Sequence, residues 1–199
     1  MKRFPTLMLM IFASTLGLAP SPALAQQALV VKPLVERKVT ALPAGPLFWR
    51  LENFPTLERA QAAAGPTGLA AQAGGKVWLF TLGPAGGASA GGTKVAEVGP
   101  LPSVVATQYL LRINEGSGPP GSISGVHSHP GSESFYVLAG ETTSRTPQGV
   151  MHVGTGESAT GHGSDTPMQV SSTGTTDLHS LVMFVVDATK LFSSPANFP

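Results

Sequence analysis

The sequence predicts an all-β fold, a sandwich or a barrel built from many short strands. Apolar residues make up 42% of the 199-residue chain, which is enough to form a folded core. The 24 glycines and 18 prolines divide the apolar residues into short runs, a pattern typical of strands joined by turns. We expect about eight to ten strands in a single domain.

The first 25 residues have the pattern of a secretory signal peptide. Lys2 and Arg3 precede an apolar run over Thr6–Ala19, and Ala23 and Ala25 supply the small residues of a cleavage site after Ala25. The run is shorter than the roughly 20 residues that span a bilayer. We therefore expect an exported protein, periplasmic or secreted, with no membrane segment after cleavage.

Residues 26–103 are expected to form an N-terminal arm, one short helix and the first barrel strands. The segment before Pro55 alternates loosely and is broken by prolines, which favours an arm or one or two edge strands. Pro55–Gly65 is the helix candidate, because a proline opens it, alanines fill it and a glycine ends it. Lys76–Leu82 is typical of a buried strand, and the glycine-rich segment Gly83–Lys94 indicates a hairpin loop.

Residues 104–199 are expected to form the core of the barrel, in one domain with the preceding segment. Several short apolar runs separated by turn residues supply its strands. In the last long run, which begins near His179, both alternating sets of side chains are largely apolar. This pattern predicts a strand that is buried on both faces.

Composition excludes several classes of protein. The chain has no cysteine, so it has no disulfide, thiolate metal ligand, cysteine nucleophile or lipidated cysteine. Charged residues make up only 12% of the chain, and cleavage would remove two positive charges and change the formal net charge from +1 to −1. The basic residues are scattered, so nucleic acid is not an expected partner.

One polar cluster, GVHSHPGSESFYVLAGE over Gly125–Glu141, has the residue types of a metal site. His127 and His129 are two residues apart, so in a strand both side chains lie on one face. A bend after His129 allows Glu133 to return a carboxylate to the same face. Two imidazoles and one carboxylate suit a divalent transition metal such as Mn, Fe, Zn, Ni or Cu. A pair of surface histidines near a turn is the simpler alternative.

The spacing of this cluster resembles the first sequence motif of the cupin superfamily. Gly121, His127, His129, Glu133 and Gly140 match all five defined positions of that motif. The resemblance covers residues 104–186 and implies a small cupin-type β-barrel, or jelly roll. It further implies that His127, His129 and Glu133 bind a metal, with Glu133 also able to accept a proton, together with a histidine from a second motif.

The second motif departs from the family pattern. Met168 stands where the family has its fourth ligand, and Ser172 replaces the usual asparagine. Three outcomes stay open: Met168 is a thioether ligand that favours copper, a shifted loop brings His162 inward, or the fourth ligand is lost. His152 and His179 are weaker candidates, since a single histidine in a strand is usually hydrogen-bonded or exposed.

The sequence leaves open whether the protein is an enzyme. One hypothesis is a metal-dependent enzyme that acts on a small organic molecule, as dioxygenase-, isomerase- and decarboxylase-like cupins do. The alternative is a non-catalytic periplasmic module that binds a small ligand or a metal. Cupins also commonly form dimers, and the segment Ala28–Phe54 is a candidate arm for a homodimer.

Overall fold

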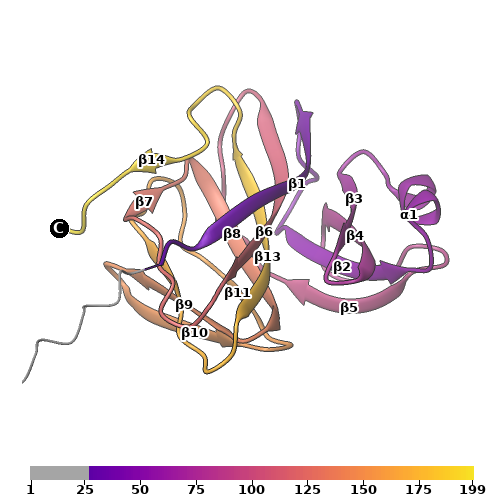
Figure 1. The fold of residues 1–199 in the computed structure, drawn as a ribbon. Helices are drawn as coiled ribbons and strands as arrows, with labels where there is room; N and C mark the ends of the chain where they lie inside the picture. Colours follow the sequence, from indigo (N-terminus) through magenta and orange to yellow (C-terminus); the bar gives the residue numbers. More distant parts are fainter. Residues whose placement is uncertain (1–26) are drawn as a thin grey trace, which may run out of the picture.

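The computed structural model describes residues 27–199, and the predicted signal peptide (residues 1–25) lies outside this range. The described chain is all-β with one short helix, as the sequence predicts (Figure 1). No helix in this range is long and apolar enough to cross a membrane. The elements are β1 (Val30–Val39), β2 (Phe48–Phe54), α1 (Leu57–Ala63), β3 (Gly68–Ala73), β4 (Lys76–Gly83), β5 (Thr93–Val98), β6 (Tyr109–Gly118), β7 (His127–Ser128), β8 (Gly131–Ala139), β9 (Glu141–Thr146), β10 (Gly149–Gly154), β11 (Ser158–Thr160), β12 (Gln169–Ser172), β13 (Leu178–Asp187) and β14 (Ser194–Pro195).

Two walls of antiparallel strands form the barrel. The first wall is a five-stranded sheet in the order β1-β6-β13-β8-β11. The second wall is the sheet β10-β9-β12, and single bridges from Ile123 to Ser171 and from His127 to Met168 connect it to the β14-β7 pair. Apolar side chains from both walls pack against each other between them, for example Phe135 of β8 and Val170 of β12.

Residues 48–98 form a separate sheet beside the barrel, in the order β3-β4-β2-β5 (Figure 1). The helix expected over Pro55–Gly65 is confirmed as α1, which the Thr56 side chain caps by accepting a hydrogen bond from the backbone N–H of Arg59. The glycine-rich segment is a loop, but the prediction of a hairpin is wrong, because β4 and β5 both pair with β2, which lies between them.

One strand joins this sheet and the barrel into a single core. On β13, Leu181, Met183 and Val185 pack against side chains of the separate sheet, whereas Val182 and Phe184 face the barrel interior. The two apolar faces expected for this strand are confirmed by this arrangement. Of the segment before Pro55, β1 lies at the edge of the barrel sheet, as predicted, whereas β2 is internal to its sheet. The homodimer expected through this segment stays a prediction.

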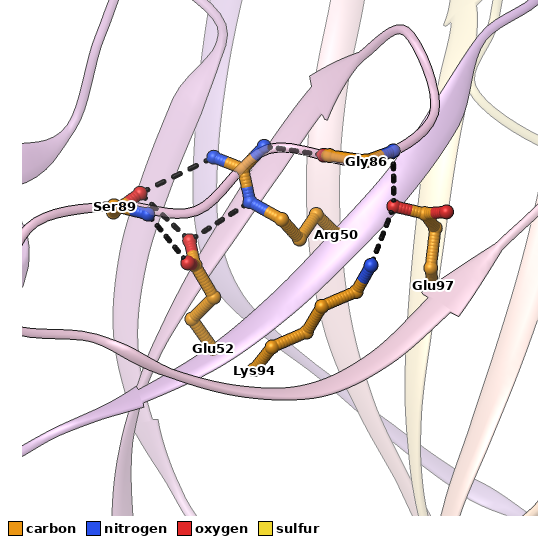
Figure 2. Close-up of polar contacts among 6 residues, drawn as sticks. All are labelled: Arg50, Glu52, Gly86, Ser89, Lys94 and Glu97. Atoms are coloured by element: carbon orange, nitrogen blue, oxygen red, sulfur yellow. Dashed lines mark hydrogen bonds and ion pairs between the residues drawn. The ribbon is translucent and has the colours of Figure 1, made fainter.

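Two carboxylates hold the glycine-rich loop against the separate sheet (Figure 2). The fully buried Glu52 accepts hydrogen bonds of 2.7 Å from both the backbone N–H and the hydroxyl of Ser89, and it pairs with Arg50 at 3.1 Å. Glu97 accepts hydrogen bonds from Gly86 N–H at 2.8 Å and from Lys94 at 2.9 Å. Burial raises the pKa of Glu52, but the bonds from Ser89 and Arg50 outweigh it and leave the pKa below its ordinary value. Glu52 is therefore a buried anion that anchors the loop.

Replacing Glu52 by glutamine is expected to lower the free energy of unfolding by about 1–3 kcal/mol, because the amide leaves a buried donor without an acceptor. Urea denaturation of both proteins at pH 7 measures this difference. Glu97→Gln is the matched control, since Glu97 is half-buried and its loss should cost less. An unchanged unfolding midpoint for Glu52→Gln would show that the loop does not depend on this carboxylate.

Candidate metal centre

The two histidines and the glutamate of the cluster converge on one point inside the barrel. β7 carries His127, the turn after it carries His129, and β8 carries Glu133 on its inward face. A ligand atom of each lies within 4.8 Å of the other two. Gly131 permits this turn, because a Cβ there would lie only 2.2 Å from the carbonyl oxygen of Val185. Gly140 has a φ of +72° and ends β8, which explains a glycine at this end of the motif.

Hydrogen bonds to backbone carbonyl groups fix the orientation of both imidazoles. Nδ1 of His127 lies 2.9 Å from the carbonyl oxygen of Gly125, and Nδ1 of His129 lies 2.6 Å from that of Phe192. A carbonyl oxygen can only accept, so each Nδ1 carries the proton, and each neutral ring keeps the lone pair of Nε2 for a ligand. This pattern, in which the second ring nitrogen donates to a carbonyl, is typical of metal-binding histidines.

Among the acidic side chains of the described residues, Glu133 has the pKa that is shifted furthest from its ordinary value. Its side chain is buried, and its Oε2 has no hydrogen-bond partner among residues 27–199. Burial raises the pKa of Glu133 to about 8. Burial is also the main cause that lowers the pKa of His129 to about 4, against an opposing hydrogen bond to Phe192. A buried carboxyl group without a partner, beside two neutral imidazoles, fits a cation that would compensate its charge.

The three side chains line a cavity of about 510 Å³. This volume lies within the usual range for small-molecule sites. The rest of the lining is mainly apolar, with a few polar groups from Asn114, Ser124 and Ser180. Lysine and arginine are absent from the described residues that line it. The apolar lining side chains are Leu29, Val31, Val126, Phe135, Val170, Val182, Phe184, Phe192 and Pro195.

The two candidates for a fourth ligand differ in position. Met168 is buried and forms an antiparallel bridge with His127, each backbone N–H donating to the other's carbonyl oxygen at 2.9 and 2.7 Å. Residues directly opposite each other in such a pair share a face, so Met168 projects to the same side as His127. His162 lies in the loop between β11 and β12 and does not join the group of donor atoms. Met168 stays a candidate fourth ligand, but it is not among the residues that line the cavity, so a site with three ligands also stays open.

The other histidines lie outside the cluster. His152, on β10, is exposed and lies 3.4 Å from Glu141, and His179, on β13, contacts Glu115 at 2.5 Å. Each of these two histidines pairs with a glutamate, and neither lines the cavity.

The C-terminal segment is the part of the site that sequence reasoning missed. Phe192 contacts His129 with its ring as well as its carbonyl, with ring centroids 4.8 Å apart. No periodic pattern in this short proline-containing segment indicated that position.

The stability of the metal-free protein should depend on pH through Glu133 and His129. Between pH 4.5 and 6.5, the folded state keeps the Glu133 proton that the unfolded state releases, which lowers stability as pH rises. Over the same range, His129 stays neutral when folded but is protonated when unfolded, which raises stability as pH rises. The two effects largely cancel. From pH 6.5 to 8 only the Glu133 effect remains, and stability should fall by about 2 kcal/mol.

Urea denaturation in the presence of a chelator, at pH 6.5 and pH 8, measures this fall. In Glu133→Gln the side chain no longer titrates, so the fall should disappear. The same fall in wild type and Glu133→Gln would show that another group is responsible.

Comparison with known proteins gives matches at the level of structure alone. No protein-family model matches the chain, and no curated protein matches it. A chain from the crystal structures of the DMSP lyases RdDddP and RnDddQII matches with a TM-score of 0.38 and 20% identity, over 44% of this chain and 44% of that chain. A cupin-like protein from Thermotoga maritima matches with a TM-score of 0.39 and 12% identity, over 44% of this chain and 65% of that chain.

An uncharacterised conserved protein from Klebsiella pneumoniae, with a double-stranded β-helix domain, is also similar. Its TM-score is 0.38 at 19% identity, over 44% of this chain and 75% of that chain. The present chain spans less than half the length of the matched DMSP lyase chain. The motif from Gly121 to Gly140 lies where its spacing requires, around the interior of an antiparallel barrel. The described chain is therefore an antiparallel β-barrel with the motif residues at its interior, in agreement with the cupin-type barrel that the sequence predicts.

Proposed function

We propose that His127, His129 and Glu133 bind one divalent transition metal, and that the protein acts on a small, mainly apolar organic molecule beside it. The observation that carries this proposal is the convergence of the three donors, within 4.8 Å of one another, in the lining of a mainly apolar cavity. Two imidazoles and one carboxylate on one side of a metal leave coordination positions free for a substrate.

The residues of the site have separate roles in this proposal. The metal, when bound, would supply Lewis-acid or redox chemistry. The hydrogen bonds to Gly125 and Phe192 fix the ring orientations of His127 and His129. Glu133 balances the charge of the metal, and its raised pKa suits it to hold a proton near neutral pH when it is not a ligand. The apolar walls exclude water and bind the body of the substrate.

The absence of lysine and arginine from the described lining favours a substrate without a strongly anionic group. Recognition would instead come from apolar contact and from the few polar side chains, above all Asn114. The side-chain oxygen of Asn114 accepts a hydrogen bond of 2.9 Å from Arg112. The side-chain nitrogen of Asn114 can therefore donate a hydrogen bond to an acceptor on the substrate. We further propose that the protein is exported and acts outside the cytoplasm, as the predicted signal peptide implies.

Metal loading tests the proposal. The chain from residue 26 onward would be purified without a metal-chelating resin, stripped with a chelator and loaded separately with Mn²⁺, Fe²⁺, Zn²⁺, Ni²⁺ and Cu²⁺. Mass spectrometry should find close to one metal per chain for at least one of these ions. An uncharged fluorescent probe, 1-N-phenylnaphthylamine, should bind in the cavity, and Val182→Phe should weaken its binding by filling that space. Failure of every metal to bind would contradict the proposal.

A non-catalytic copper-binding module is the second candidate function. The buried position of Met168 opposite His127 favours it, because a thioether from that side would close the site with a soft ligand. Met168→Leu keeps the side-chain volume and removes the sulfur. Selective loss of copper in Met168→Leu would support the closed copper site, and unchanged binding of all metals would support the open three-ligand site.

A further inference from the structure

The C-terminal residues form a strap across the metal centre. We define the C-terminal strap as residues 191–199, which follow β13 and include β14. Along the strap, the even-numbered residues are half-buried and the odd-numbered residues are exposed. Figure 1 shows this segment running past β7 to the end of the chain. Phe192, Ser193 and Pro195 line the cavity.

The strap contacts both candidate histidine ligands. β14 pairs with β7 so that Pro195 lies opposite His127, and the backbone N–H of Ala196 donates to the carbonyl oxygen of Val126 at 3.0 Å. The carbonyl oxygen of Phe192 accepts the Nδ1 proton of His129 at 2.6 Å. The strap therefore supplies the group that sets the tautomer of His129 and an edge strand that supports His127.

Aromatic contacts fasten the strap at two points. The ring of Phe192 packs against His129 and Phe184, with centroid distances of 4.8 and 4.9 Å, and the guanidinium of Arg112 lies 4.4 Å from its centroid. Near the other end, Arg145 of β9 lies 4.6 Å from the centroid of Phe198. Exposed cation–π contacts contribute little individually. The attachment thus depends mainly on Phe192 and on the β14-β7 pair.

We infer that the C-terminal strap is part of the metal centre: Phe192 positions His129 for metal binding, and the strap forms one wall of the cavity that ligands enter. This inference rests on the proposed metal function. Removal of a hydrogen-bond partner of a metal-binding histidine usually lowers metal affinity about 10- to 100-fold. Loss of the strap should have at least this effect on affinity and should also open the cavity.

Deletion of residues 191–199 tests the inference, with Phe192→Ala and Phe198→Ala as milder variants. Leu191→Ala is the matched control, because the Leu191 side chain is 77% exposed. Competition with a chelator, using Co²⁺ as the probe, should show metal affinity reduced about 10- to 100-fold in the deletion variant. The reduction should be smaller in Phe192→Ala and in Phe198→Ala, and absent in Leu191→Ala. Circular dichroism would confirm folding, and if the deletion variant does not fold, the two point variants decide.

Two measurements on the metal-free protein test the role of the strap independently of metal binding. The ring Nδ1–H signal of His129 in the NMR spectrum should persist in wild type and Leu191→Ala and exchange away in the deletion variant. Stopped-flow mixing with 1-N-phenylnaphthylamine should show faster entry into the opened cavity. Equal metal affinity and equal probe entry in wild type and the deletion variant would overturn the inference. If wild type binds no metal, the proposed metal function fails, and the probe and NMR measurements alone decide whether the strap forms one wall of the cavity.

Discussion

Replacing His127 by alanine is expected to abolish stoichiometric metal binding. Its imidazole is one of the three histidine and carboxylate donors that converge in the described part of the chain, and loss of one of them should leave a site of little affinity. The loss should exceed the roughly 10- to 100-fold effect of removing a hydrogen-bond partner of a ligand. Mass spectrometry of the metal-loaded proteins and competition with a chelator measure it.

His152→Ala is the matched control for this substitution. His152 is an exposed histidine on β10 that contacts Glu141 and Thr143 rather than the cavity. Metal binding that disappears in both variants would mean that the loss in His127→Ala is not specific to the cluster. Metal retained at full stoichiometry in His127→Ala would remove the cluster from consideration as a metal centre.

The convergence of the three candidate ligands was predictable because its geometry is local in the sequence. His127 and His129 share a face through strand periodicity, and the turn at Gly131 needs only a few residues to return Glu133 to them. The two-sided burial of β13 was predictable for a similar reason, since both of its alternating sets are apolar. In each case the pattern that determines the structure lies within about ten consecutive residues.

The rest depends on contacts between distant segments, which a single sequence does not reveal. The hydrogen bond from His129 to Phe192 joins residues 63 positions apart, and nothing in the composition of the strap marks it as part of a metal site. The pairing of β2 between β4 and β5 likewise follows from tertiary contacts, so the loop that looked like a hairpin connects two strands that are not neighbours. Whether Met168, His162 or neither residue supplies a fourth ligand likewise depends on how the segment between β11 and β12 packs.

Replacing Trp78 by alanine is expected to destabilise the barrel and the separate sheet together, by about 3–5 kcal/mol. Trp78 is buried on β4, where its ring lies 6.1 Å from that of Phe80 and 6.0 Å from that of Tyr136 on β8 of the barrel. Its Nε1–H also donates to the carbonyl oxygen of Ala73 at 3.0 Å. The substitution would therefore leave a cavity at the junction of the two sheets and a carbonyl without its donor.

Urea denaturation followed by two signals tests whether the junction makes one cooperative unit. In Trp78→Ala the remaining tryptophan, Trp49, reports on the separate sheet, and release of bound metal reports on the barrel. Because Trp49 belongs to the same core as Leu181 and Met183 of β13, both signals should change at the same, lowered urea concentration. Trp78→Phe, which keeps an aromatic ring, should lower the midpoint less. Metal retained at urea concentrations above the one at which Trp49 becomes exposed would show that the barrel is stable without the separate sheet. Residues 48–98 would then not contribute to the stability of the barrel.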